Sequence, residues 1–568
     1  MRRICVGSLA AALLLAGPSL AGIAETKHNL SVTGPGPIKS TTEGEICVFC
    51  HTPHDAKQDT PFLWNRRDST VNYNTYDSST LLAAIGQPTG ASKLCLSCHD
   101  GTIALGDVIS RLVEIPFAGG IRFLPSGPTN LEANLADDHP ISLLYDDALV
   151  ANRGELLPPD TLINDVRLDP NGMLQCTSCH DAHDDSFGQF LVQPNNFSAI
   201  CLQCHAPRDW MTSSHALSTA VWNTQDADPW PHTPFATVAE NGCENCHRPH
   251  GAGGPERLLN YAPEEDNCLT CHNANVASTD VEAELLKLVR HPVQDTVGIH
   301  DPTEDFTGTV ATHVECVDCH NPHRASDATA SAPAVPGVLS GVSGITASDQ
   351  QVDDATLAFE ICFKCHADNN VVTFSEIPRQ LPEINTRLEF DISSPSFHPV
   401  EAGGKNPDVP SLLSPYTESS LIYCTDCHNN DDGPAAGGSG PAGPHGSAHR
   451  FLLEENYTTA DNTAESPFEY AMCYKCHNRA SILDDESFSQ HDKHISGEEA
   501  PCSACHDPHG ISLTKGNPIN NSHLINFDVS IVGPNGNGDL FFEDGVVPFS
   551  GRCSLLCHGE DHAGEKYP

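Results

Sequence analysis

The feature that most constrains this chain is a repeated arrangement of cysteine and histidine. Of its 25 Cys, 24 form twelve closely spaced pairs, and a His directly follows the second Cys of every pair. Eleven pairs have the spacing Cys-x-x-Cys-His, whereas the twelfth has one extra residue between its thiols. Numbered 1 to 12 in chain order, the motifs are Cys47/Cys50/His51, Cys95/Cys98/His99, Cys176/Cys179/His180, Cys201/Cys204/His205, Cys243/Cys246/His247, Cys268/Cys271/His272, Cys316/Cys319/His320, Cys362/Cys365/His366, Cys424/Cys427/His428, Cys473/Cys476/His477, Cys502/Cys505/His506 and Cys553/Cys557/His558.

This arrangement is the attachment signature of haem c. The two thiols form thioethers with the haem vinyl groups and the adjacent His binds the iron, so one short helical turn positions all three side chains. Zinc sites do not require a His after every second Cys, and disulfides within such pairs would close only tiny loops. The sequence therefore predicts twelve covalently attached haems, with the motif histidines as proximal ligands.

The chain also has enough histidine for a second axial ligand on every iron. Of 31 His, nineteen are not proximal. Five of these follow a proximal His by three residues, and because three residues span at most about 10 Å, each must point at a different iron from its own. These trailing histidines are His54, His183, His250, His323 and His509.

A second group of histidines precedes the motifs and is expected to complete the haem that follows. This group comprises His28, His139, His232, His291, His398 and His494. His445 is preferred as a ligand over His449, because it shares a Pro-His-Gly context with His250 and His509. Ligand and surface roles stay open for His215, His300, His313, His449, His491, His523 and His562.

The N-terminus predicts export. Arg2 and Arg3 precede an apolar run at 4–15 and then small residues, which is typical of a secretory signal ending within 1–24. The run is shorter than the roughly 20 residues needed to span a bilayer. Removing the signal changes the net charge from -46 to -48, which disfavours nucleic acid as a partner.

The motifs alternate in type, so the mature chain is predicted to consist of six two-haem units. Odd-numbered motifs tend to have small or acidic residues between their thiols, and even-numbered motifs begin with Leu or an aromatic residue in most cases. The predicted units are 25–110, 111–210 with a haem-free insertion, 211–280, 281–380, 381–480 and 481–568.

The expected fold class is a multihaem cytochrome c with little regular secondary structure, in which short helices and loops wrap around a stacked haem chain. Hydrophobic residues make up 39 % of the chain, and Gly and Pro together number 86, which favours turns. A helix is predicted at 280–290, and a small β-rich or irregular subdomain at 100–175. Segments 325–351 and 431–446 are predicted to be linkers or surface loops.

The motif pattern resembles the doubled C-x-x-C-H family of multihaem cytochromes, and more closely the outer-surface c-type cytochromes of metal-respiring bacteria. The similarity rests on His28-Asn-Leu-Ser, Ile46 to His54, Leu94 to Gly101, Cys502 to Gly510 and His523-Leu-Ile-Asn-Phe527. The resemblance implies low-potential haems with two His ligands, a continuous haem stack and an extracellular or outer-membrane location. Some relatives are lipoproteins, but no Cys lies beside the cleavage region of this chain.

These observations favour an electron conduit over an enzyme, since spare His exceed the irons and no Cys-x-x-Cys-Lys occurs. Expected partners are other multihaem cytochromes or an outer-membrane conduit, with metal ions or chelates as electron acceptors. The expected location is the periplasm, the outer-membrane surface or the exterior, and a homo-oligomer or filament stays open. The alternatives are a nitrite or hydroxylamine reductase with one open iron and a periplasmic electron store.

Overall fold

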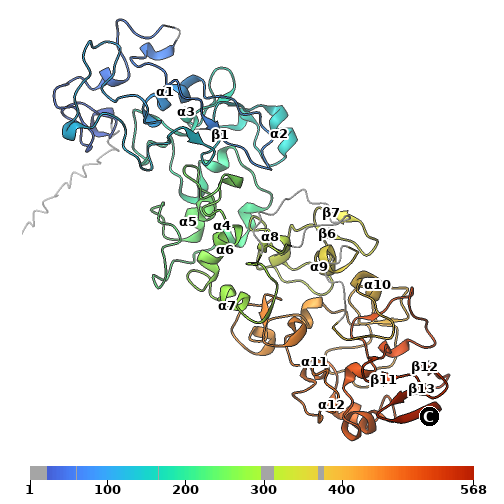
Figure 1. Ribbon diagram of the computed structural model, residues 1–568. Helices are drawn as coiled ribbons and strands as arrows, with labels where there is room; N and C mark the ends of the chain where they lie inside the picture. Colours follow the sequence, from blue (N-terminus) through green and yellow to red (C-terminus); the bar gives the residue numbers. More distant parts are fainter. Residues whose placement is uncertain (1–21, 59, 164, 296–312, 369–375, 568) are drawn as a thin grey trace, which may run out of the picture. The chain divides into compact units, whose positions relative to one another are not determined.

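The computed structural model describes residues 22–58, 60–163, 165–295, 313–368 and 376–567 (Figure 1). The predicted signal at 1–24 lies almost entirely outside the described residues. The chain divides into two compact units. An N-terminal unit comprises Met1–Pro207 and His247–Asn260, and a C-terminal unit comprises Arg208–Cys246 and Tyr261–Pro568. The finer division into six two-haem units stays a prediction.

The described backbone has little regular secondary structure, as the composition predicts. The three longest helices, α1 (Gly90–His99), α6 (Glu264–His272) and α9 (Ala358–His366), each end at the proximal His of an even-numbered motif. The other α-helices are short: α2 (Asp147–Arg153), α3 (Cys176–Cys179), α4 (Ser214–Leu217), α5 (Val238–Asn241), α7 (Val281–Leu285), α8 (Cys316–Cys319), α10 (Thr386–Phe390), α11 (Ala471–Tyr474) and α12 (Arg479–Leu483).

Most strands are two residues long and pair with one partner. The parallel pair is β1 (Asn74–Thr75) with β2 (Asn134–Leu135). The antiparallel pairs are β3 (Leu143–Leu144) with β4 (Met173–Leu174), β5 (Val289–Arg290) with β9 (Gly446–Ser447), β6 (Gly344–Ile345) with β7 (Gln351–Val352), and β8 (Ser396–Phe397) with β10 (Gly510–Ile511). Except for the local hairpin of β6 with β7, these pairs join segments that are distant in sequence, so each of them fastens a loop rather than building a sheet.

The one larger sheet lies at the C-terminus (Figure 1). Its order is β11 (Val532–Gly533), β13 (Gly551–Cys557) and β12 (Phe541–Asp544), and β14 (Glu560–Tyr567) also pairs with β13. The pairing of β13 with β14 is antiparallel and carries one register shift, between Cys553 and Ser554. This hairpin contains motif 12.

The apolar cores are several small clusters next to the motifs. One packs Ile345, Phe359, Phe363, Phe390 and Phe397 together with smaller side chains. Half-buried motif cysteines border several of the clusters, namely Cys50, Cys98, Cys204, Cys316, Cys319, Cys424, Cys505, Cys553 and Cys557. These thiols therefore lie at the edges of the protein's own cores.

The predicted helix at 280–290 is wrong in its second half. Asp280 caps α7, because its carboxylate accepts a hydrogen bond from the Ala283 amide at 2.9 Å. The helix ends at Leu285, and Val289 and Arg290 form β5 instead. Leu285 is 3 % exposed but Leu286 is 74 % exposed, so these two apolar residues do not share one buried face.

Two of the other segment predictions have different outcomes. Segment 325–351 is not a free linker, because Val342 and Ile345 are 4 % and 2 % exposed and lie in two apolar cores. Segment 100–175 is mostly irregular, with α2 and the short strands β2, β3 and β4, as predicted. The sequence pattern of this loop-rich segment did not predict that residues within 325–351 would be buried.

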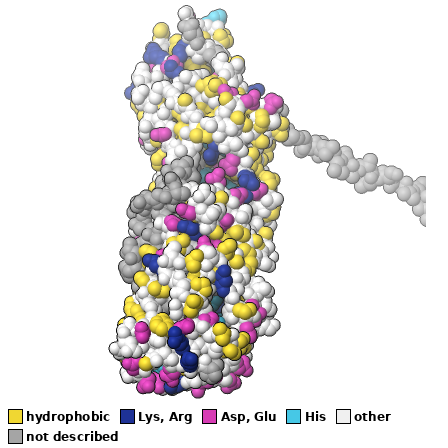
Figure 2. Space-filling model, turned by 90° about the vertical axis from the view of Figure 1, so that its right-hand side faces the viewer, with side chains coloured by type: hydrophobic (Ala, Val, Ile, Leu, Met, Phe, Trp, Pro, Cys, Tyr) yellow, Lys and Arg dark blue, Asp and Glu magenta, His cyan; other side chains and the backbone are white. Residues whose placement is uncertain are grey.

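The space-filling view shows acidic side chains spread over one face, among hydrophobic and uncharged ones, whereas histidine is hardly visible there (Figure 2). This agrees with the acidic composition and with histidines that point inward. None of the helices in the described ranges combines the length and apolar character needed to cross a membrane.

Candidate functional site

Each Cys-x-x-Cys-His motif forms a single helical turn that ends at its proximal His. In motif 1 the His51 amide donates to the Cys47 carbonyl at 2.8 Å, and in motif 3 the His180 amide donates to the Cys176 carbonyl at 3.0 Å. Motif 11 repeats this bond between His506 and Cys502. Both thiols and the imidazole thus come from one turn, which is the arrangement that haem attachment requires.

In three odd-numbered motifs, the second residue between the thiols closes this turn. The Asp318 carboxylate accepts a hydrogen bond from the Glu315 amide at 2.8 Å, and Asp426 accepts one from the Tyr423 amide at the same distance. The Ser178 hydroxyl has the same role in motif 3. Short polar side chains fit here because they reach the free amides at the start of a turn.

Even-numbered motifs are anchored differently. The first residue between their thiols is a buried apolar side chain in three of them, at Leu96, Leu269 and Phe363. In motifs 8 and 10 the second residue is a lysine that reaches the preceding odd-numbered motif. Lys364 donates to a carbonyl of motif 7, and Lys475 donates to the corresponding carbonyl of motif 9 at 2.7 Å. Each of these lysines joins two consecutive motifs.

Ten proximal histidines face a second imidazole, with ring centroids 6.0–6.4 Å apart. The pairs are His51–His183, His99–His28, His180–His250, His205–His139, His272–His215, His320–His445, His366–His291, His428–His509, His477–His398 and His506–His491. A metal–imidazole bond is about 2 Å long and the ring centre lies roughly 1 Å beyond the nitrogen, so two axial imidazoles on one iron have centroids about 6 Å apart. The observed separation therefore fits one iron between each pair.

The hydrogen bonds of these imidazoles leave the correct nitrogen free. Nδ1 of His51 lies 2.6 Å from the Phe62 carbonyl, and Nδ1 of His99 lies 2.7 Å from the Thr129 carbonyl. A carbonyl only accepts, so Nδ1 carries the proton and Nε2 keeps the lone pair that a metal needs. The same bond from Nδ1 to a backbone carbonyl occurs in His28, His139, His180, His215, His291, His320, His398, His428 and His506.

Burial favours the neutral form of several of the paired imidazoles. It lowers the pKa of His272, His366, His428 and His506 to about 4, and a neighbouring His adds to the effect in each case. A neutral imidazole is the form that donates its lone pair to iron. Haem c bound by such pairs supplies a one-electron ferric/ferrous couple with no open coordination position.

The pairs follow an interleaved order. For an odd-numbered motif, the second imidazole belongs to a His that follows the next odd-numbered motif. His51 of motif 1, for example, faces His183, which follows motif 3. For an even-numbered motif, the second imidazole belongs to a His that lies before the preceding odd-numbered motif. His205 of motif 4, for example, faces His139, which lies before motif 3. The expectation that His139 completes the next haem is therefore wrong by one motif.

Motif thiols lie next to one another in sequence order within each unit. The Cys95 and Cys176 thiols hydrogen-bond across motifs 2 and 3, and Cys362 and Cys424 do so across motifs 8 and 9. Similar contacts join Cys268 to Cys316 and Cys473 to Cys502. In these four cases, consecutive attachment sites are thus spatial neighbours.

Cys365 is the predicted second attachment thiol of motif 8. It is half-buried in the last turn of α9, directly before His366. Cys362, the first thiol of the same motif, makes the contact between motifs 8 and 9. The prediction that Cys365 attaches haem rests on the motif and on its place beside His366.

Some histidines predicted as ligands have other surroundings. His54 is exposed and faces no second imidazole among the described residues. Nε2 of His232 donates to the Glu244 carbonyl at 3.2 Å, so that nitrogen is engaged. His323 packs edge-on against Trp210 at 6.1 Å, and His247 donates from Nδ1 to the Arg257 carbonyl at 2.8 Å.

Three histidines that the sequence left open face another imidazole: His215, His491 and His562. His300 lies outside the described residues. His215 precedes motif 5, so the rule that a His before one motif serves the following even-numbered motif would have found it. For His491 and His562 no sequence signal separates ligand from surface residue.

Motif 12 differs from the other eleven because it lies on a strand. Cys553 and Cys557 both belong to β13, and His558 follows in the hairpin turn with a positive φ of 50°. Four residues of strand span about 13 Å, whereas three residues of helix rise only about 5 Å. His494, predicted as a distal ligand, faces His562 rather than His558, at 6.3 Å.

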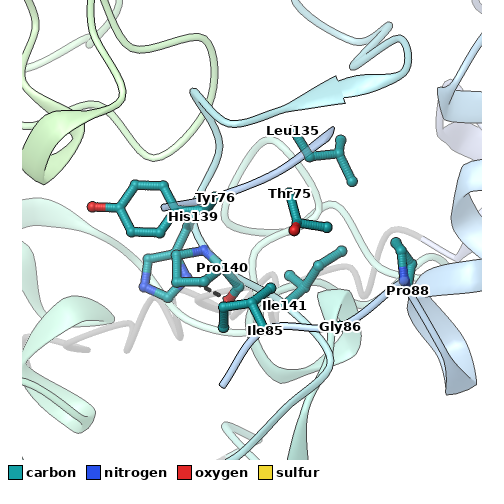
Figure 3. A pocket seen from close by; sticks show the side chains of 9 residues that line it. All are labelled: Thr75, Tyr76, Ile85, Gly86, Pro88, Leu135, His139, Pro140 and Ile141. Carbon is teal, nitrogen blue, oxygen red and sulfur yellow. Dashed lines mark hydrogen bonds between the residues drawn. The ribbon is translucent and has the colours of Figure 1, made fainter. Parts of the chain in front are cut away.

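A small recess beside His139 has a mostly apolar lining (Figure 3). Nδ1 of His139 donates to the Pro140 carbonyl at 3.1 Å, and burial lowers the pKa of this imidazole. The other lining residues are Thr75, Tyr76, Ile85, Gly86, Pro88, Leu135 and Ile141. None of them is charged.

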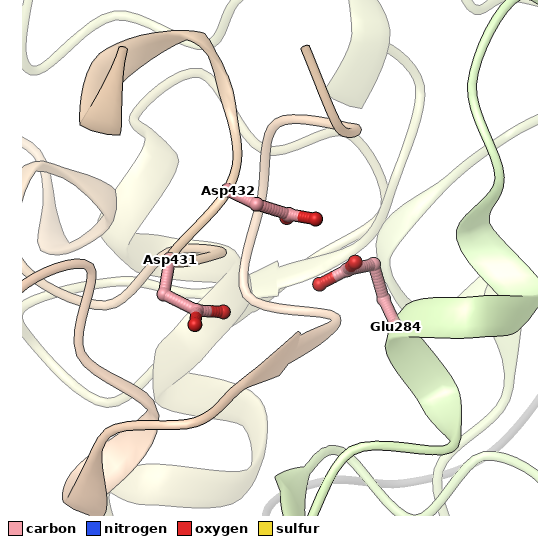
Figure 4. Close-up of side chains that lie close together, drawn as sticks. All are labelled: Glu284, Asp431 and Asp432. Carbon is pink, nitrogen blue, oxygen red and sulfur yellow. The ribbon is translucent and has the colours of Figure 1, made fainter. Parts of the chain in front are cut away.

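One group of carboxylates could hold a metal ion by its geometry, and it comprises Glu284, Asp431 and Asp432 (Figure 4). However, the Lys287 ammonium lies 2.7, 2.6 and 3.2 Å from these three carboxylates in that order. The lysine supplies the positive charge that a metal would otherwise provide. The group is therefore a structural ion cluster at the junction of α7 with the segment after motif 9.

The sequence comparisons agree with this geometry. The family model for the doubled CXXCH motif matches residues 170–209 and 232–277, which contain motifs 3 to 6. No curated protein matches the chain. The eight other motifs repeat the pattern of the matched segments, with the wider spacing at motif 12. The chain therefore contains the doubled CXXCH motif over motifs 3 to 6, and its twelve motifs are consistent with a multihaem c-type cytochrome.

Proposed function

We propose that this cytochrome is an electron conduit that carries twelve haems, all with two axial histidines, and that it exchanges electrons with partner proteins or metal acceptors outside the inner membrane. The observation that carries this proposal is the series of imidazole pairs at one constant separation. An iron held between two such imidazoles has no position for a substrate, so electron exchange is the chemistry left to it.

The contacts between consecutive motifs support conduction along the chain. Motif thiols touch across motifs 2 and 3, 6 and 7, 8 and 9, and 10 and 11. The thioether-bearing haem edges attached at these positions would be neighbours. Buried Lys364 and half-buried Lys475 keep two of the motif pairs together, so the relative positions of successive haems are fixed by the protein.

The proposed partners are other multihaem cytochromes or an outer-membrane conduit, with metal ions or chelates as terminal acceptors. The acidic composition, with 75 Asp and Glu against 29 Lys and Arg, would attract cations and basic partner surfaces at low ionic strength. The signal-like sequence within 1–24 and the covalent haem motifs support export to the periplasm or beyond.

A nitrite or hydroxylamine reductase is the alternative function. It would need at least one iron with an open position. Motif 12 departs from the common geometry, because His558 directs its Nε2 to Asp461 at 2.8 Å. A periplasmic electron store would share all the bis-histidine features of a conduit and would differ in having no dedicated acceptor.

Reduction followed by reoxidation tests the proposal. The holoprotein, reduced by a low-potential donor, should be oxidised rapidly by soluble ferric chelates of different size and charge, without saturation by any one of them. Nitrite and hydroxylamine should cause no turnover. Saturable nitrite reduction together with a high-spin ferric signal would favour the reductase.

A further inference from the structure

We propose that the twelfth iron is bound by His494 and His562, and not by His558, the histidine adjacent to the motif cysteines. The inference rests on the proposed twelve-haem function and assigns the axial ligands of its least regular site. All the residues involved belong to the C-terminal unit.

The first observation is the pair itself. The His494 and His562 rings lie with centroids 6.3 Å apart, within the range of the ten pairs that include a proximal His. Nδ1 of His494 donates to the Gln490 carbonyl at 2.7 Å, and Nδ1 of His562 lies 3.1 Å from the Glu565 carboxylate. Both Nε2 atoms are free of hydrogen-bond partners among the described residues. The pair therefore has the same tautomer and spacing as the other axial pairs.

The second observation is the position of His494 in the interleaved order. The second imidazole of an even-numbered motif comes from before the preceding odd-numbered motif, and His494 precedes Cys502 of motif 11. It is thus the histidine that the order assigns to motif 12. His491, three residues earlier, faces His506 of motif 11, which has no later odd-numbered motif to supply its partner.

The third observation concerns β13 and β14. Leu555 lies opposite His562 in the hairpin, and the motif cysteines are two residues before and two residues after Leu555. Alternate residues of a strand share a face, so Cys553, Leu555, Cys557 and His562 project from the same side of the hairpin. His562 is only 5 % exposed, and the two thiols border the same apolar cluster as Leu555. The hairpin thus places the His562 ring on the side of β13 that borders this cluster.

The fourth observation excludes His558 in this conformation. Its Nε2 donates to the Asp461 carboxylate at 2.8 Å, and its Nδ1 lies 3.9 Å from the Glu498 carboxylate. Both ring nitrogens therefore face acidic groups. Haem attachment involves the two thiols and not the axial ligands. Each thiol S–H adds across a vinyl C=C bond without any net oxidation or reduction.

His562→Ala is the decisive variant, because it leaves the motif Cys553/Cys557/His558 intact for attachment. Intact mass should still show twelve haems. Electron paramagnetic resonance of the oxidised holoprotein should show one high-spin ferric centre, with eleven irons low-spin. The control His523→Ala should leave every iron low-spin, because the His523 imidazole lies beside Asp544 and Phe542 and faces no second imidazole among the described residues.

His562→Met guards against loss of the hairpin in the alanine variant. A methionine sulfur at this position should keep the iron low-spin, add the charge-transfer band of sulfur-ligated ferric haem and raise the potential of one haem. If His562→Ala leaves all irons low-spin and His562→Met adds no such band, His558 is the ligand and the proposal is wrong. Eleven haems in the wild-type mass would also overturn it. In the first case the proposed conduit stands, because the other eleven irons stay low-spin, whereas a mass with eleven haems would also lower the proposed haem count by one.

Discussion

The imidazoles of His428 and His509 lie 6.0 Å apart although 81 residues separate them in sequence. Nδ1 of His509 donates to the carboxylate of Glu389 at 3.0 Å, and Glu389 is only 5 % exposed. Burial raises the pKa of Glu389 to about 7, and the bond to His509 opposes that effect. For His509, burial favours the neutral ring, but Glu389 outweighs it and raises the pKa.

Glu389→Gln should raise the reduction potential of the haem held between His428 and His509. An anionic acceptor at Nδ1 makes the imidazole a stronger donor and favours ferric iron, whereas an amide oxygen does so less. The expected change is roughly 60 mV, the one-electron equivalent of a tenfold change in equilibrium constant. Spectroelectrochemical titration measures it as a shift of one component among twelve.

Glu376→Gln is the matched control for this change. Glu376 is 55 % exposed and pairs with Arg450 on the surface, so its replacement should leave every potential in place. Equal shifts in the two variants would mean that the effect is one of net charge, and that the bond from His509 does not tune the haem.

His183→Ala should convert one iron to high spin, and this iron should be the one bound by His51 of motif 1. The reason is that the His183 ring faces His51 with centroids 6.2 Å apart, although His183 follows motif 3. His54→Ala is the matched control, because His54 follows motif 1 at the same spacing as His183 follows motif 3. It should leave every iron of the isolated chain low-spin. Magnetic circular dichroism distinguishes the two. A high-spin iron at motif 3 in His183→Ala would show that a trailing His binds its own haem.

The attachment motifs and the scarcity of regular structure follow from local sequence. A turn such as Cys176–Cys179 needs only its own residues and the polar side chain of Ser178. That a trailing His must serve another haem than its own follows from chain length alone, because His183 cannot reach around the haem attached beside it. Local sequence therefore predicts the role of each motif and which side chains are available as ligands.

The identity of the pairs could not be predicted, because it depends on contacts over long sequence distances. His445 faces His320 across 125 residues, and His291 is oriented by the Pro444 carbonyl at 2.7 Å. Motif 12 is the clearest failure of local reasoning. Its spacing looks like a variant turn, but pairing with β14 makes Cys553 and Cys557 part of a strand.

Lys287→Met should destabilise the protein by about 2 kcal/mol, because Glu284, which is 2 % exposed, then loses its cationic partner. Asp431 and Asp432 lose the same ammonium. Excess Ca²⁺ should recover part of the lost thermal stability in the variant and change the wild type little. Calorimetric scans with and without Ca²⁺ measure this.

The surface variant Lys405→Met is the control for that experiment, since its ammonium donates to the exposed Ile392 carbonyl outside the acidic cluster. A Lys287→Met protein as stable as the wild type would show that the three carboxylates are already neutralised by protonation.

Stability should fall as pH rises from about 4.5 to about 7 through the Glu401 carboxyl. Burial raises the pKa of Glu401 to about 7, and Asp391 adds to the effect. The folded protein then binds a proton that the unfolded chain has already released, so folding is penalised as pH rises. Glu401→Gln should flatten this part of the thermal stability profile and melt higher than wild type above pH 7. The exposed Glu418→Gln should keep the wild-type slope, and an equally steep slope in Glu401→Gln would contradict the assignment.

The most direct test of the account is low-temperature electron paramagnetic resonance of the fully oxidised wild-type holoprotein, with haem counted by intact mass on the same sample. Paired imidazoles at 6.0–6.4 Å predict that every ferric iron is low-spin, with an integrated intensity equal to the haem count. A high-spin signal that integrates to one haem or more, and that shifts on addition of nitrite, would show an open iron and contradict the conduit.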